Sequence, residues 1–160
     1  MDNVDAERKL QNRVLKWLED DLGYTYIGNL EDLDNTAIKP DLLRKNLKDR
    51  GYSKRQIQQA ISRLEQTANN QVDSLYQVNR NVYSLLRYGL QGVRDEKGNR
   101  PTIHYIDWKH FDKNDFAVAE EVSVLRYDGN THKRPDVVLY VNGIALGRSE
   151  EHTSELQSHL

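Results

Sequence analysis

The sequence predicts an α+β fold in which helices come first and a mixed or antiparallel sheet follows. Up to about residue 88, apolar residues recur at helical spacing. From residue 90 onward they fall in short runs rich in valine, separated by turn residues, as they do in strands. We therefore expect one domain whose first helices cover the sheet and in which residues 29–88 form a helical insertion.

The first and last of four predicted helices rest on apolar periodicity. The first is expected over about 5–22, and the last over 72–88, either continuous or broken, before Gly89. In the first, four apolar residues recur every four positions along one side of a helix and a glycine stop follows: Leu10, Val14, Leu18, Leu22 and Gly23.

Two helices between them are predicted to form a hairpin. Pro40 begins one, which ends at Gly51. Ser53-Lys54-Arg55-Gln56 is a capping box that begins the other, which continues to Leu64.

The same hairpin is rich in basic residues. Eight Lys or Arg stand between residues 39 and 63 against Asp41 and Asp49. A helix, turn, helix pattern of this kind suits DNA contact, with Arg44, Lys48 and Arg55 as candidates that would position phosphates. A solvated basic face is the plainer alternative.

Three strand regions are predicted in the second half of the chain. Thr102–Trp108 alternates in polarity, and 116–125 is rich in valine and alanine. Arg134–Val141 leads through Asn142-Gly143, the strongest short hairpin signal, into 144–146.

Composition excludes several classes of function. The chain has no cysteine, so it has neither disulfides nor a thiolate metal site or nucleophile. No signal peptide, no apolar run of membrane length and no phosphate-binding loop of the G-x-x-x-x-G-K-[ST] type occur. We expect a cytoplasmic protein that does not contact the membrane, and no ATP binding by such a loop in this piece.

The last thirteen residues, 148–160, lack any strand or helix period, and Arg148–Ser158 resembles one reading frame of a common sequencing adapter. We therefore expect 1–147 to be the natural fragment, 148–160 to be a non-native tail, and strand order to fail soon after Leu146. Without the one Arg and three Glu of the tail, 22 Lys+Arg face 22 Asp+Glu, so nucleic-acid affinity would need local patches.

The residues around the predicted hairpin suggest a metal-dependent nuclease site. Asp136 stands at the head of an apolar strand, and an acid-x-lysine pattern one hairpin later would complete a site for phosphodiester hydrolysis. Two acids would hold Mg²⁺ through oxygen, and the lysine would stabilise the developing charge. Here Glu150 occupies the acid position and His152 stands where lysine should be.

The turn decides whether the two acids can meet. A two-residue turn at Asn142-Gly143 would put Asp136 and Glu150 on opposite faces of the hairpin. A three-residue loop, Val141–Gly143, with a left-handed Gly143 would put them on one face, ~7–8 Å apart. The nuclease hypothesis therefore predicts the three-residue loop.

Four motifs together resemble the N-terminal region of type I restriction enzyme R subunits: Gly23-Tyr24-x-Tyr26, Tyr83–Gly89, Asn114-Asp115-Phe116 and Arg134–Gly143. The resemblance covers almost all of 1–147. It implies a PD-(D/E)xK nuclease fold, here incomplete, placed ahead of an ATP-dependent translocase motor that this chain lacks. It also implies Mg²⁺ as cofactor and assembly with methylation and specificity subunits into a complex that cuts unmodified DNA.

Carried over to this sequence, only Asp136 matches the catalytic pattern intact. Glu150 matches in type and position, in a foreign context, and His152 departs from the lysine. We therefore expect this chain to be inactive as it stands. The rival hypotheses are a DNA-binding module based on residues 40–66, and a scaffold piece that docks to partner subunits.

Aromatic residues offer one further pattern. The tyrosines Tyr76, Tyr83 and Tyr88, with Trp17 and Trp108, are expected in a core or a domain interface rather than on a base-stacking platform.

Overall fold

The computed structural model describes residues 3–30, 37–123 and 134–149 of the chain. The chain divides into two compact units, which are described one at a time. Unit 1 comprises residues 1–36, 116–140 and 145–160, and unit 2 comprises residues 37–115 and 141–144. No helix among the described residues is long and apolar enough to cross a bilayer.

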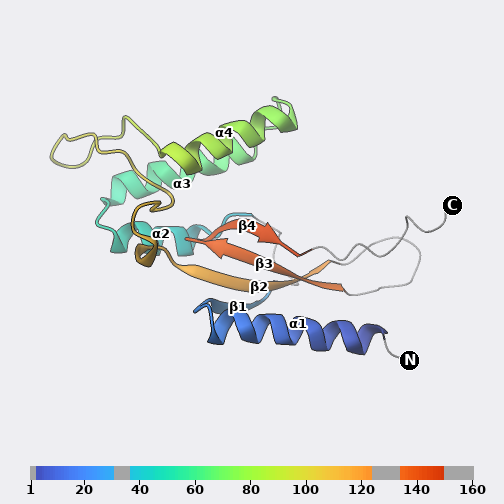
Figure 1. Ribbon diagram of the computed structural model, residues 1–160. Helices are drawn as coiled ribbons and strands as arrows, with labels where there is room; N and C mark the ends of the chain where they lie inside the picture. The colour runs from blue at the N-terminus through green and yellow to red at the C-terminus, as the bar shows by residue number, and fades with distance from the viewer. Residues whose placement is uncertain (1–2, 31–36, 124–133, 150–160) are drawn as a thin grey trace. The chain divides into compact units, whose positions relative to one another are not determined.

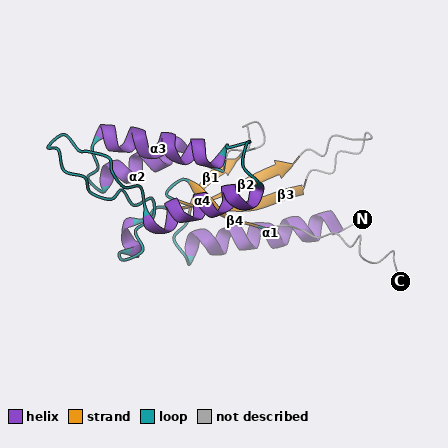
Figure 2. Ribbon diagram, turned by 90° about the horizontal axis from the view of Figure 1, so that it is seen from above, coloured by secondary structure: helices purple, strands orange, loops and turns teal. Residues whose placement is uncertain are grey.

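Unit 1 is a helix beside a four-stranded mixed sheet (Figures 1 and 2). Its elements are α1 (Asn3–Asp20), β1 (Thr25–Asn29), β2 (Phe116–Ser123), β3 (Arg134–Val141) and β4 (Ile144–Arg148), and the strand order is β1-β2-β3-β4. Strands β1 and β2 are parallel. The arrows of β2, β3 and β4 alternate in direction, so these three strands are antiparallel (Figure 1). The α+β class and the mixed sheet are confirmed.

Side chains alternate between the two faces of this sheet. On one face, Leu15 and Leu18 of α1 are buried against strand residues, namely Val118, Val137 and Leu139. The other face carries a second apolar cluster, made of Ile27, Leu30, Ala117, Ala119, Val138, Tyr140 and Ala145. Helix α1 is confirmed, but of its predicted apolar stripe only Leu18 is buried, because the helix turns Leu15 and Leu18 to the sheet and leaves Leu10 and Val14 exposed.

Unit 2 contains three α-helices and one short 3-10 helix. These are α2 (Pro40–Asp49), α3 (Lys54–Ala68), α4 (Leu75–Tyr88) and η1 (Phe111–Lys113). The predicted capping box is present: the Ser53 hydroxyl accepts from the Gln56 N–H, and the Gln56 side chain accepts from the Ser53 N–H. Helix α4 is continuous and ends at Gly89, which has a φ of 81°. A side chain at Gly89 would place a Cβ 2.7 Å from the Ile103 carbonyl oxygen, so the helix can end only in glycine there.

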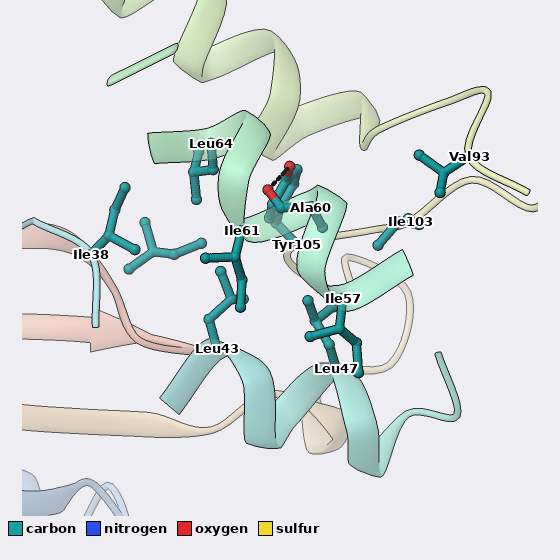
Figure 3. Close-up of a cluster of buried hydrophobic side chains, with 11 residues drawn as sticks. Ile38, Leu43, Leu47, Ile57, Ala60, Ile61, Leu64, Val93, Ile103 and Tyr105 are labelled. Atoms are coloured by element: carbon teal, nitrogen blue, oxygen red, sulfur yellow. Dashed lines mark hydrogen bonds between the residues drawn. The ribbon is translucent and has the colours of Figure 1, made fainter. Parts of the chain in front are cut away.

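The core of unit 2 lies between α2, α3 and the segment around Tyr105 (Figure 3). Tyr105 is fully buried, and its hydroxyl donates to the Ala60 carbonyl oxygen at 2.7 Å (Figure 3). Burial raises the pKa of this phenol, so the buried hydroxyl stays protonated and keeps its hydrogen bond.

The strand predicted over Thr102–Trp108 is wrong. Ile103 and Tyr105 do alternate inward, but they pack into the core of unit 2, and the only pairing described there is a single bridge from Ile103 to Leu90. Beyond it the Asp107 carboxylate accepts from the N–H groups of Lys109 and His110, which turns the chain. Alternation thus reflects packing against helices rather than a place in the sheet. Conversely, the sequence did not predict β1.

The aromatic side chains expected in a core or a domain interface do not lie in a core of the described chain. Tyr76, Tyr83, Tyr88, Trp17 and Trp108 are all exposed. The predicted limits of the helical insertion, 29–88, and of the non-native tail, 148–160, stay predictions; α2, α3 and α4 lie in unit 2 together with residues 89–115.

Candidate active site

The turn between β3 and β4 has two residues. Asn142 and Gly143 both have positive φ, 52° and 78°, which is the backbone of a type I′ turn. The three-residue loop Val141–Gly143 is therefore wrong, because it needs Asn142 in the right-handed region. A type I′ turn suits a hairpin because the twist of its backbone matches the twist of the strands. Asn-Gly favours this turn because both residues tolerate a positive φ.

Asn142 is held in this conformation by four hydrogen bonds. Its N–H donates to the Asp115 carbonyl oxygen at 2.8 Å, and its Oδ1 accepts from the Asp115 N–H at 2.7 Å. Its Nδ2 donates to the Tyr105 carbonyl oxygen at 2.9 Å and to Asn114 Oδ1 at 2.8 Å. The side chain is fully buried, so these bonds have no competition from water and fix the tip of the hairpin.

Gly143 is held by close contact with the start of α2. Its carbonyl oxygen accepts from the Lys39 N–H at 2.6 Å. A Cβ at this position would lie 2.6 Å from the Lys39 carbonyl oxygen and 2.9 Å from the Leu43 nitrogen. Both contacts involve backbone, so no side chain fits and the turn requires glycine.

A second polar side chain of α2 extends the network. Asn46 is buried and donates through Nδ2 to the Lys113 carbonyl oxygen and to Asp115 Oδ2, both at 3.0 Å. Arg50 donates to Asn46 Oδ1 at 2.8 Å and to the Tyr105 carbonyl oxygen at 3.2 Å. Burial lowers the pKa of the Arg50 guanidinium. Arg50 is thus part of the support of the hairpin rather than of the basic surface.

Strand β4 contains one residue more than its pairing with β3 requires after a two-residue turn. A two-residue turn would place Arg148 across from Val137. Instead the Ser149 N–H donates to the Val137 carbonyl oxygen at 2.8 Å, and the Ser149 hydroxyl accepts from the Val137 N–H at 2.8 Å. Gly147 likewise lies against Leu139, where a Cβ would be 3.6 Å from the Leu139 Cβ. The extra residue that the nuclease hypothesis placed in the turn is therefore found within β4, as in a β-bulge.

The pairing of β2 with β3 places the backbone of an acidic residue level with Asp136, a residue that the sequence analysis did not single out. The bond from the Asn142 N–H to the Asp115 carbonyl fixes the antiparallel register, and Val118 accordingly clusters with Leu139. Continued along the ladder, this register places Glu121 level with Asp136, the third residue of β3. Two consecutive glutamates in an apolar strand were the sequence signal for it.

The neighbouring glutamate has a different role. Glu120 accepts a hydrogen bond from the Tyr26 hydroxyl at 3.3 Å. Burial and this carboxylate together raise the pKa of Tyr26. Glu120 therefore links β2 to β1 and serves as a natural comparison for Glu121.

The other predicted site residues lie at the limit of what the structure describes. The backbones of Asp136 and Glu121 belong to β3 and β2, while their side chains, Glu150 and His152 lie outside the described part. In that described part, no group of three or more His, Cys, Asp or Glu side chains could hold a metal ion.

Comparison with known proteins identifies the family. A family described as "Type I restriction enzyme R protein N terminus" matches residues 6–155, which is nearly the whole chain. The chain belongs to this family. A type I restriction enzyme endonuclease subunit of Methanocaldococcus jannaschii is 33% identical over 67 residues, which are 40% of this chain and 6% of that protein. The matched part of this R protein N terminus thus corresponds to a small fraction of its relative.

The basic residues proposed for DNA contact are exposed in this R protein N terminus. Arg44 and Lys48 lie on α2, and Arg55 lies in the first turn of α3. Arg44 is within 2.7 Å of Asp41, and Lys45 pairs similarly with Asp49 at 2.9 Å. Local acids thus offset part of the positive charge on α2.

Substituting Arg44, Lys48 and Arg55 by Ala in a complete R protein is expected to weaken DNA binding evenly across sequences. The salt dependence of binding should flatten by roughly one unit for each lost phosphate contact. Because Arg44 already has a carboxylate partner, its single substitution should change the slope least. Binding titrations at several salt concentrations would measure this, and an unchanged slope would mean that the basic face is only solvated.

Proposed function

We propose that this chain is the nuclease part of a type I restriction enzyme R protein and that, in the complete subunit, it hydrolyses DNA phosphodiester bonds with Mg²⁺. The fold would be an incomplete PD-(D/E)xK fold. ATP would be used by the motor domain, and the methylation and specificity subunits would be the partners. The observation that carries the proposal is the β3–β4 hairpin, with Asp136 in β3 and one extra residue in β4.

The extra residue matters because it changes which positions are level. Ser149 is level with Val137, so the described end of β4 is one residue out of step with the register of a plain two-residue turn, which is the register that would separate Asp136 from Glu150. The two-residue turn is therefore compatible with the nuclease hypothesis.

The donor set suits the proposed metal. Asp136 and Glu121 are level in the sheet, and Glu150 is the third acid of the set; carboxylate oxygens are the ligands that Mg²⁺ prefers. Mg²⁺, when bound, would activate water and offset charge on the phosphate. The residues of this chain would hold the carboxylates at a fixed spacing. The hydrogen bonds of Asn142 at the tip of the hairpin would help to fix that spacing.

The missing lysine is the reason to expect inactivity. A lysine ammonium is a permanent positive charge at neutral pH, whereas a histidine imidazole is not. Loss of one preorganised group that stabilises the transition state costs on the order of 10²–10³ in rate. The chain as given should therefore not cut DNA.

The test restores the motif. The restored R protein carries Arg148→Val, Ser149→Ile, Glu151→Leu and His152→Lys, joined to the downstream core and motor of an R protein, and is assayed with its partner subunits, ATP and Mg²⁺. We expect cutting that EDTA abolishes. The matched control has the same three other substitutions with His152 retained, and should be at least about 10²-fold slower. Equal cutting by both would contradict the proposal.

The second candidate is a non-catalytic DNA-binding module formed by α2 and α3, which the exposure of Arg44, Lys48 and Arg55 favours. DNA binding without any Mg²⁺-dependent cutting by the restored R protein would support it.

A further inference from the structure

Four residues of α4 form a stripe of alternating tyrosine and arginine. Tyr76, Arg80, Tyr83 and Arg87 are spaced by four, three and four residues. At 100° per residue they fall within an arc of about 60° on the helix. The opposite side of α4 packs on the core of unit 2 through its apolar residues, which include Val78, Val82 and Leu85. We name the four residues the α4 stripe.

The α4 stripe is exposed. Tyr76 and Tyr83 have 75% and 62% of their surface exposed, and both arginines are exposed as well. Both rings therefore leave most of their apolar surface in contact with water, where it is available for stacking. The stripe contains no aliphatic residue, unlike the face of a helix that docks in an apolar groove.

The charge of the α4 stripe has one sign. Helix α4 contains no aspartate or glutamate, and among the described residues neither Arg80 nor Arg87 forms an ion pair. The Arg87 guanidinium lies 5.5 Å from the centre of the Trp108 ring. That ring is in turn held by a bond from Trp108 Nε1 to the Leu86 carbonyl oxygen at 3.0 Å. One positive charge of the stripe is thus held in place without being neutralised.

We propose that the α4 stripe binds single-stranded DNA, with bases stacked on Tyr76 and Tyr83 and phosphates bound by Arg80 and Arg87. Cationic groups interleaved with aromatic rings match the alternation of phosphate and base in a nucleic acid. The two tyrosines are about 10 Å apart along the helix axis, the length of roughly three stacked nucleotides. The bases must be unpaired, because the faces of paired bases are covered by their neighbours in the duplex.

This proposal rests on the proposed function only in its choice of DNA as the ligand. Binding is therefore measured on the 160-residue chain in EDTA, where metal-dependent cutting cannot occur. The probe is a fluorescent 20-mer of thymidylate, with a duplex of the same length for comparison, followed by anisotropy. The single strand should bind more tightly than the duplex.

Three sets of variants test the stripe. Tyr76→Ala with Tyr83→Ala should weaken single-strand binding by about 30-fold or more, since each stack contributes at least about fivefold. Tyr76→Phe with Tyr83→Phe should keep the affinity, because phenylalanine also stacks. Arg80→Gln with Arg87→Gln should flatten the salt slope by about 1.4 units.

The matched control is Tyr88→Ala. Tyr88 lies on the same helix and is equally exposed, at 64%, but it lies about 120° around the axis from Tyr76. This variant should bind like the original chain. The proposal is overturned if Tyr88→Ala weakens binding as much as the double alanine variant, if the phenylalanine variant loses affinity, or if the duplex binds as tightly.

Other outcomes also decide it. No measurable binding by the original chain would overturn the proposal. Unchanged oligonucleotide binding by the double alanine variant, with weaker assembly with partner subunits, would assign the stripe to a protein partner instead. Neither result bears on cutting by the restored R protein, so the two proposals fail separately.

Discussion

Asp136→Ala is expected to abolish Mg²⁺-dependent cutting by the restored R protein while the fold stays intact. Asp136 supplies the first acid of the proposed site, and no other carboxylate on β3 can take its place. Glu121→Gln is expected to slow cutting by about 10²-fold or more, because the register of β2 and β3 places it level with Asp136. Cleavage of unmodified plasmid DNA would measure both effects.

The control for this pair is Glu120→Gln, one residue away on the same strand. Glu120 accepts a hydrogen bond from the Tyr26 hydroxyl, and the amide oxygen of a glutamine can accept the same bond. Cutting should therefore be nearly unchanged. Circular dichroism and thermal unfolding would verify that each variant is folded. Undiminished cutting by Asp136→Ala would disprove the site, and equal effects of the two glutamine variants would remove Glu121 from it.

Asn142→Asp is expected to lower the free energy of unfolding by about 3–5 kcal/mol. The new side chain could still accept from the Asp115 N–H. Its second oxygen, however, would replace the Nδ2 donor and face the Tyr105 carbonyl and Asn114 Oδ1, both acceptors. A carboxylate would thus be buried without a donor at that position, which is the costliest kind of polar substitution.

Asn142→Gly separates the backbone from the side chain. Glycine accepts the positive φ of this position without strain, so only the side-chain hydrogen bonds are lost, at about 1 kcal/mol each. Asn142→Ala should lie between glycine and aspartate, because it adds the strain of a left-handed alanine. Urea unfolding at pH 7 would rank the three. If Asn142→Gly were as stable as the original chain, the side-chain hydrogen bonds would not be the reason that asparagine is needed.

The elements with a clear local signal were predicted well from the sequence. The capping box at Ser53, the glycine stop at Gly89 and the bounds of β3 are confirmed, since each depends on residues close together in the chain. The strand over 102–108 failed because the alternation of Ile103 and Tyr105 is created by helices far along the sequence. The alternation of apolar residues along a short segment does not reveal whether the segment packs against helices or pairs with a strand.

The candidate site was predicted in outline only. The hairpin was predicted from Arg134–Val141 and Asn142-Gly143, and the place of Asp136 in the site stays a prediction. The place of the extra residue could not be found, because a bulge in β4 is set by the bonds between Val137 and Ser149. Glu121 was missed because its position depends on the pairing of β2 with β3, which only the folded chain fixes.

The buried Asn142-Gly143 pair also has a consequence for chemical ageing. In an unfolded chain, the Gly143 nitrogen can attack the Asn142 carboxamide carbon, release ammonia and form a cyclic imide, which water opens mainly to aspartate or isoaspartate. In the folded chain the carboxamide is engaged at Oδ1 and Nδ2, and this fixes the turn against ring closure. Each long excursion to the unfolded state therefore risks a change that destabilises the native state, so unfolding of this region would become irreversible with time.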